Sequence, residues 1–348
     1  MQDFTAHRLT FITQAQDWIE LNEHQGSALR GALFHALRNR FCAFSRQPEM
    51  ACGTCPIAPT CAVATLVSTL DPDHNRGQDR PRPFTVQPPI RQAEAGTTLF
   101  TGHYWERPDG TGVFRYEPGE SLSFGLTLYA GALALFPYVI LALQEFEAGG
   151  LGRSCLQNNG RWRRGRLTVR EIWAENPLTG ERQPVLRQGE RLVQVPDVPV
   201  THALIEQRAQ ALASCPTLRL DFLTPTRLVE QGHLVKPHQF RFRPFFQRLL
   251  ERLEALSEAF CDTPLRVDFP TLLTAADAVQ VSEQHLFWED LRSYSTRRHA
   301  ESPIGGLLGW VTLTAEDWTP FLPYLLWGQF THVGKDAVKG NGWYVVNC

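Results

Sequence analysis

The chain has 348 residues, in which 34 Lys and Arg residues oppose 36 Asp and Glu residues, giving a formal net charge of -2. This length predicts two domains, and a composition of 43% hydrophobic and 20% charged residues excludes a disordered chain or a coiled coil. The balanced charge excludes a protein that is basic over its whole surface. It leaves open a local nucleic-acid site, because such a site depends on local charge.

The predicted elements follow a similar order in the two halves of the chain. In the first half we expect a strand at 7–15, a helix at 24–41 capped by Asn22, a loop at 71–92, strands at 97–105 and 111–116, a strand and helix at 121–148, and a strand at 166–173. In the second half we expect a strand at 217–223, a helix at 245–260, strands at 286–296 and 304–314, a helix at 318–330, and a strand at 343–346.

This order predicts an α+β fold of two tandem ferredoxin-like βαββαβ domains, because each half ends with a helix, a glycine-rich turn and a strand. The expected domains are 1–185, with a cysteine-rich metal-binding insertion at about 42–65, and 200–348, with a glycine-rich loop at 332–342. Residues 174–200 contain several prolines and charges, which indicates a region between the domains.

The compartment is predicted from what the first residues lack. The N-terminal stretch has no basic start followed by an apolar run, so we expect no secretory signal and a reducing cytoplasmic location. The uncharged stretch 121–143 is shorter in continuous apolar sequence than the ~20 residues of a membrane span. It begins with strand alternation and contains Pro137. A strand, a turn and a buried helix are therefore expected there, with no membrane contact.

Four of the eight cysteines lie within twenty residues, at the spacing C-x9-C-x2-C-x5-C: Cys42, Cys52, Cys55 and Cys61. Two thiolates at x2 spacing can bind one ion, and Gly53 suits the turn between them. Four thiolates match a closed structural zinc site, and an iron–sulfur cluster requires the same number of ligands. Four ordinary buried cysteines are the remaining alternative. The other four cysteines are scattered and are expected to have no such role.

The first helix places polar residues opposite its apolar side. Leu29, Leu33 and Leu37 define the apolar face at 100° per residue, whereas His24, Gly31 and His35 project away from it. A histidine beside an arginine on an open helix face suits acid–base chemistry at a phosphate. The alternative is two solvated surface histidines.

Only three of the 34 basic residues are lysines, and arginine binds phosphate with a planar fork and also stacks on bases. Six arginines occur between 153 and 170 without any acidic residue, and Trp162 lies among them. This pattern favours RNA backbone contacts combined with base stacking, with a solvated hairpin as the alternative. The predicted RNA-binding arginines are Arg153, Arg161, Arg163, Arg164, Arg166 and the smaller pair Arg297 and Arg298.

The loop from His332 to Gly342 is rich in glycine and holds two of the three lysines. Glycines allow backbone N–H groups to close on a phosphate, and lysines add positive charge. The nucleotide P-loop pattern is absent, and a strand follows instead of a helix, so a polyanionic chain is the expected ligand. Its predicted binding residues are Gly334, Lys335, Lys339, Gly340 and Gly342.

Several of these segments together resemble the RAMP superfamily, and in particular the endoribonucleases that process CRISPR precursor RNA. The resemblance is carried by Phe222–Leu228, Tyr294–Arg298, Gly305–Gly309, the loop His332–Gly342 after the helix at 321–326, Gly149–Gly152, and the four-cysteine insertion. It is strongest over 217–346 and weakest over 66–115. One departure is the sequence Gly340-Asn341-Gly342, where many members have an apolar residue between the glycines.

The resemblance implies two ferredoxin-like domains, a CRISPR repeat RNA as substrate and metal-independent cleavage. In that chemistry the ribose 2′-OH attacks the adjacent phosphorus, leaving a 2′,3′-cyclic phosphate and a 5′-OH. A histidine near the first helix often acts as the catalyst, and His24, His35 and His332 are the matching residues here. Mature crRNA and other CRISPR effector subunits are the implied partners. No cofactor is expected for catalysis.

Two other functions fit the same sequence. A non-catalytic RNA-binding subunit of a CRISPR effector complex would use the same fold and basic patches. A regulator that senses zinc or redox state would use the cysteine cluster. Cleavage of repeat RNA in EDTA distinguishes the nuclease from the first of these.

Overall fold

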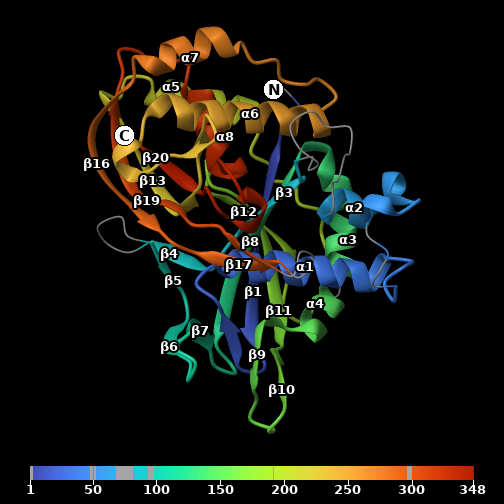
Figure 1. The fold of residues 1–348 in the computed structure, drawn as a ribbon. Helices are drawn as coiled ribbons and strands as arrows, with labels where there is room; N and C mark the ends of the chain where they lie inside the picture. Colours follow the sequence, from blue (N-terminus) through green and yellow to red (C-terminus); the bar gives the residue numbers. More distant parts are fainter. Residues whose placement is uncertain are drawn as a thin grey trace.

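The computed structural model describes residues 3–47, 50, 52–67, 81–92, 98–190, 192–295 and 300–348. The C-terminal half forms the upper part of the molecule in Figure 1 and the N-terminal half the lower part. Each half is built on one antiparallel sheet with helices packed against it.

The main sheet of the first half has the strand order β12-β11-β1-β8-β3. Its βαββαβ unit consists of β1 (Ala6–Ala15), α1 (Gln25–Phe41), β3 (Phe84–Gln87), β8 (Ser121–Tyr129), α3 (Phe136–Leu141) with α4 (Leu143–Gly149), and β11 (Leu167–Asn176). The fourth strand of the unit lies beside the first, followed by the third and second, as in a ferredoxin-like sheet. Strand β12 (Glu181–Leu186) extends this sheet, so part of the region expected between the domains belongs to the first half.

The second half repeats this arrangement in a four-stranded sheet, β16-β19-β13-β20. Its unit consists of β13 (Thr217–Thr226), α6 (Phe242–Phe260), β16 (Gln280–Glu289), β19 (Gly306–Thr314), α8 (Leu322–Thr331) and β20 (Tyr344–Asn347). Helix α6 is strongly amphipathic, and its apolar side chains at three- and four-residue spacing, such as Leu249, Leu253 and Leu256, are fully buried. Burial of each such side chain contributes roughly 1.5–3 kcal/mol.

Smaller elements complete the molecule. A second sheet in the first half, β10-β9-β2-β7-β6, contains β2 (Ile19–Leu21), β6 (His103–Glu106), β7 (Gly112–Tyr116), β9 (Leu151–Leu156) and β10 (Trp162–Gly165). Three short pairs are β4 (Ile90–Gln92) with β5 (Thr98–Phe100), β14 (Val229–Glu230) with β15 (His233–Leu234), and β17 (Arg292–Ser295) with β18 (Ala300–Pro303). The remaining helices are α2 (Ala62–Val67), α5 (His202–Leu212) and α7 (Phe269–Asp277), with single turns η1 (Cys52–Thr54), η2 (Ala58–Thr60), η4 (Ala130–Leu135), η5 (Pro237–Gln239) and η6 (Ala337–Lys339).

The two halves share part of one core. Phe4 is fully buried, and its ring meets Trp327 of α8 edge-on with the ring centroids 4.9 Å apart. The hydroxyl of Tyr129, at the end of β8, donates to the carbonyl oxygen of Phe330 at 2.7 Å. Ala6 also pairs with Val200 across a single β-bridge. Residues of the first half therefore complete the apolar core of the second.

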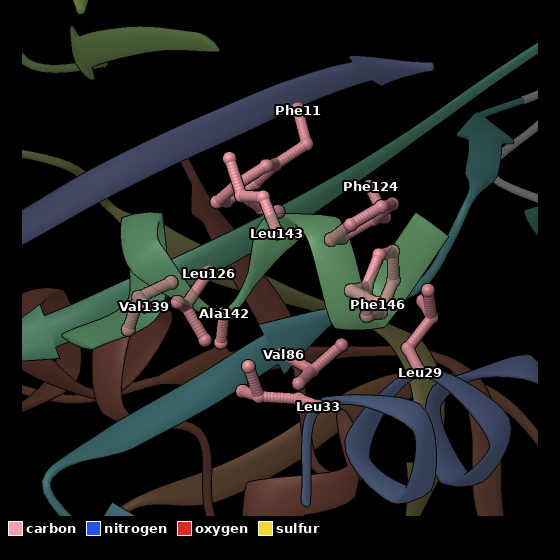
Figure 2. A pocket seen from close by; sticks show the side chains of 11 residues that line it. Phe11, Leu29, Leu33, Val86, Phe124, Leu126, Val139, Ala142, Leu143 and Phe146 are labelled. Atoms are coloured by element: carbon pink, nitrogen blue, oxygen red, sulfur yellow. The ribbon is translucent and has the colours of Figure 1, made fainter. Parts of the chain in front are cut away.

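An apolar pocket lies where α1 meets the first sheet. Figure 2 shows side chains from β1, β8, α1, α3 and α4 converging on it, among them Phe11, Leu29, Leu143 and Phe146. All the side chains that line it are apolar, so it belongs to the packing that fixes α1 against the sheet.

The stretch 121–143 forms β8, the turn η4, and two helices that bend by 52° at Ala142. The single helix expected from Gly131 is therefore divided. Among the residues described, no single helix has the length and apolar character of a membrane span, whereas the bent pair Ala130–Leu141 and Leu143–Gly149 together has both.

Two of the scattered cysteines form a disulfide, which the sequence analysis did not expect. Cys215 precedes β13 and Cys348 follows β20, and these two strands are neighbours in the second sheet. Strand pairing brings their Cα atoms to 5.7 Å, within the usual range for a disulfide. A separation of 133 residues in sequence hid this pairing.

Candidate functional site

The N-terminus of α1 is anchored to the glycine-rich loop of the second half. His24 is the N-cap residue, and its Nδ1 lies 2.8 Å from Ser27 Oγ. Its Nε2 contacts the side-chain oxygen of Asn341. Asn22, which was expected to be the cap, does not have this role. A side chain on Gly26 would overlap the carbonyl oxygen of Lys339, so a glycine is needed for the close approach.

His24 and His332 are both buried at this anchor. His24 is 7% exposed, and burial together with the charge of Lys339 lowers its pKa to about 4, although its contact with Asn341 acts in the opposite direction. His332 is fully buried and stacks on Trp343 with 5.9 Å between the ring centroids. Burial and the charge of Arg252 lower its pKa to about 3. Both imidazoles are therefore neutral and enclosed at neutral pH.

His35 has a different environment, on the exposed side of α1. Burial of part of its ring lowers its pKa, and the positive charges of Arg164, Arg38 and Arg30 lower it further. Arg164 belongs to β10, so positive charges from two separate elements act on this imidazole. Of the three histidines predicted to be catalytic, His35 alone faces solvent.

Gly31 lies one turn before His35 on the same side of the helix. A side chain there would meet no atom within 4 Å. The surface beside His35 is therefore open along this turn, as the position of Gly31 on the polar side of the helix predicted.

The arginine-rich segment forms the hairpin β9–β10, which projects at the lower end of the molecule in Figure 1. Trp162 is 66% exposed, and Arg161 and Arg164 are also exposed. Arg153 is half-buried in β9. The hairpin thus presents an aromatic side chain between two exposed arginines.

Three arginines of this segment are bound within the protein. Arg163 and Arg166 each lie 2.8 Å from a carboxylate oxygen of Asp17, and Arg170 donates to Gln14. The absence of acidic residues from 153–170 therefore overstated the free positive charge. Asp17 lies 146 residues from Arg163 in sequence, so only the fold shows this neutralisation.

The glycine-rich loop differs from the predicted phosphate cradle. The N–H groups of Lys335, Lys339, Gly340 and Gly342 donate to backbone carbonyls of the protein, which leaves these four donors no role in phosphate binding. Lys339 pairs with Asp336 at 2.8 Å, whereas Lys335 is exposed. The loop instead fastens α1 to the second sheet, since Thr224 Oγ1 in β13 donates to the carbonyl oxygen of Gly340 at 2.7 Å. Gly334, which has a φ of 81°, allows the chain to pass close to the carbonyl oxygen of Arg227.

The hairpin β17–β18 lies beside the first turn of α1, where Ser293 Oγ is 3.2 Å from Ser27 Oγ. Arg297 and Arg298 fall outside the described residues, so their predicted RNA contacts stay a prediction.

The four clustered cysteines are all free and half-buried. Cys42 is the C-cap of α1, Cys52 begins the turn η1 and Cys55 follows it, and Cys61 precedes α2. Across the part of the chain that the structure describes, no group of three Cys, His, Asp or Glu side chains is placed to bind a metal ion. The thiols as arranged do not fit the predicted zinc or iron–sulfur site, which stays a prediction.

Family models match both halves of the chain. A family model described as an N-terminal domain, AF_1859_N, matches residues 4–198, more than half of the chain. The model of the CRISPR-associated endoribonuclease Cas6 matches residues 220–344. The C-terminal part of this chain is a Cas6 endoribonuclease domain.

Solved structures show the same Cas6 fold. A Cas6 product complex from Thermus thermophilus superposes with a TM-score of 0.53 at 14% identity, covering 99% of each chain. A partial Cas6-RT-Cas1–Cas2 complex gives a TM-score of 0.55 at 13% identity, covering 99% of this chain and 46% of that one. A sequence search of curated proteins finds no match. The tandem ferredoxin-like prediction is confirmed by this Cas6 fold.

Some residues of the candidate site were missed by sequence reasoning. Asn341 was noted only as a departure from the family pattern, yet it contacts His24 across 317 positions. Nothing in the local sequence indicates that contact. Arg30 was also missed, because it lies five residues before His35 and about 140° away around the helix, so helical spacing gives no sign that its charge acts on His35.

Proposed function

We propose that this Cas6 chain binds CRISPR repeat RNA and cuts it without a metal ion, releasing mature crRNA. The observation that carries the proposal is the position of His35, which is exposed on the polar side of α1 beside the open turn at Gly31 and is subject to the positive charges of arginines from α1 and β10. A depressed histidine pKa keeps the imidazole neutral at neutral pH, which is the form that accepts a proton.

In the proposed reaction, neutral His35 removes the proton of the ribose 2′-OH. The 2′ oxygen then forms a bond to the adjacent phosphorus, and the bond from phosphorus to the 5′ oxygen breaks. The leaving 5′ oxygen takes a proton from water, His35 later returns its proton to the solvent, and the products are a 2′,3′-cyclic phosphate and a 5′-OH. Guanidinium groups such as that of Arg164 would stabilise the negative charge that develops on the phosphate oxygens.

The β9–β10 hairpin is proposed to hold the RNA beside His35. Exposed Trp162 offers a stacking surface, and Arg161 and Arg164 offer charge to the phosphates. One related structure contains Cas6 together with RT-Cas1 and Cas2. Association with other CRISPR subunits is proposed for this chain on that likeness.

We expect the purified protein to cut a repeat RNA at one position in the presence of EDTA. The upstream product should carry a 2′,3′-cyclic phosphate, which resists a phosphatase until acid opens the ring. A control RNA with a single 2′-deoxyribose before the cut should bind equally and remain intact. Binding without cleavage would contradict the nuclease and support the non-catalytic subunit.

The rate of cleavage should fall at acid pH as His35 becomes protonated. Because burial and the arginines lower its pKa below the usual 6.5, the loss should begin below that pH. Arg164→Gln removes one positive charge, raises the pKa of His35 and should move the loss of single-turnover rate to higher pH. Arg161→Gln, on the same hairpin, should weaken RNA binding without that displacement. Identical pH profiles for wild type and Arg164→Gln would contradict this role of His35.

A further inference from the structure

The second sheet has one face covered by helices and one that is open. Leu220 of β13 and Val311 of β19 point into the core beneath α6 and α8, and both are fully buried. Alternate residues point to the opposite face. Trp310 lies there between Asp221 of β13 and His285 of β16, and Phe287 lies opposite Leu308.

Three aromatic rings lie next to one another on this open face. The ring of His285 lies 6.4 Å from Trp310 and 6.4 Å from Phe287, measured between centroids. Phe287 is 43% exposed. An aromatic side chain that is exposed to water on an edge strand contributes little to the stability of the fold. It can contribute stacking energy to binding when a flat ligand covers it.

An arginine completes the surface. The guanidinium of Arg219 lies 4.3 Å from the ring centroid of Trp310. Asp221 holds it in place at 2.7 Å and in turn accepts a hydrogen bond from Asn347. The side chain of Arg219 is about one-third exposed, so its guanidinium can still donate to a phosphate while Asp221 holds it beside Trp310.

We propose that Arg219, His285, Phe287 and Trp310 form a platform that binds an unpaired segment of RNA by base stacking. The two central strands of a ferredoxin-like sheet carry Arg219 and Trp310, and in RNA-recognition sheets of this topology bases stack on side chains of such strands. Asp221 is already paired with Arg219, whereas Glu283 is exposed and Glu289 is half-buried on this face of β16. A polyanion with flat bases matches the rings and the guanidinium together.

The platform connects to the α1 site through the chain itself. Strand β16 leads into β17, and Ser293 of β17 lies 3.2 Å from Ser27 of α1. The proposal therefore deepens the proposed function: the platform would hold a single-stranded flank while α1 acts on the repeat.

Binding of a fluorescent oligouridylate to the full-length protein tests the platform. Phe287→Ala and Trp310→Ala should each weaken binding by at least about fivefold, the lower end for loss of one stacked base. Trp310→Phe should retain most of the affinity. Tyr104→Ala removes an aromatic side chain that is 61% exposed on β6 and serves as the matched control. Thermal melts of all variants confirm folding.

A direct readout comes from photocrosslinking with an oligonucleotide that contains 4-thiouridine. Crosslinks in peptides carrying Phe287 or Trp310 support the platform. Equal affinity of wild type and Phe287→Ala, or crosslinks confined to β9–β10, would overturn it, as would a change only in self-association. Cleavage in EDTA is measured separately on the wild type. If the wild type does not cleave RNA but binds the oligouridylate, and Phe287→Ala weakens that binding, the nuclease is refuted and the platform is supported.

Discussion

The His35→Ala variant should cut repeat RNA at least about 10²-fold more slowly than the wild type, the effect of losing a general acid–base group. Single-turnover rates with saturating enzyme measure this loss apart from any change in binding. Because His35 is exposed and its ring has one aromatic neighbour, Phe34, at 5.4 Å, the substitution should leave the melting temperature nearly unchanged.

Two other histidines serve as controls for this result. His238→Ala alters an exposed imidazole in the second half and should cut RNA at the wild-type rate. His24→Ala should lower thermal stability first, because it removes the cap of α1 and the contact that the side-chain oxygen of Asn341 makes with His24. A folded His24→Ala variant that loses cleavage while His35→Ala retains it would transfer the catalytic role to His24.

Gly26→Ala should be strongly destabilising, by about 1–3 kcal/mol or more, because the added methyl group overlaps backbone and cannot be relieved by turning a side chain. The carbonyl oxygen of Lys339 would have to move, and with it the loop that joins α1 to the second sheet. Chemical denaturation measures the change in the free energy of unfolding.

Gly31→Ala is the matched control on the same helix. It meets no atom within 4 Å and should increase stability by roughly 0.5–1 kcal/mol, the helix propensity of alanine over glycine. If RNA approaches this turn closely, the same variant should still weaken RNA binding. Equal stabilities for the two alanine variants would contradict the close contact between α1 and the loop.

Regular patterns in the sequence predicted the main elements. The alternation of apolar and polar residues predicted the first strand, and the leucines at helical spacing predicted α1. The repeated order of elements predicted the tandem fold. Helices α5 and α7 were missed although their caps were visible: Thr201 accepts from the backbone N–H of Leu204, and Asp268 accepts from that of Thr271.

The site was predictable only where it is local. Spacing on one helix placed Gly31 and His35 on an open side, and both are there. Pairings between distant residues, such as Asp17 with Arg166 or Cys215 with Cys348, leave no mark in nearby sequence. The burial of His332 was also hidden, because its loop reads as polar and solvent-exposed until the fold covers it.

The contact of Phe4 and Tyr129 with α8 has a consequence for dissecting the protein. A fragment beginning near residue 200 would contain every strand of its own sheet. It would lack the rings of Phe4 and Tyr129, which contact α8 in the intact chain. We therefore expect that fragment to expose Trp327 and aggregate, and the intact chain to unfold in a single cooperative transition. By topology the molecule is two repeats, but because they share this core we expect them to unfold as one unit.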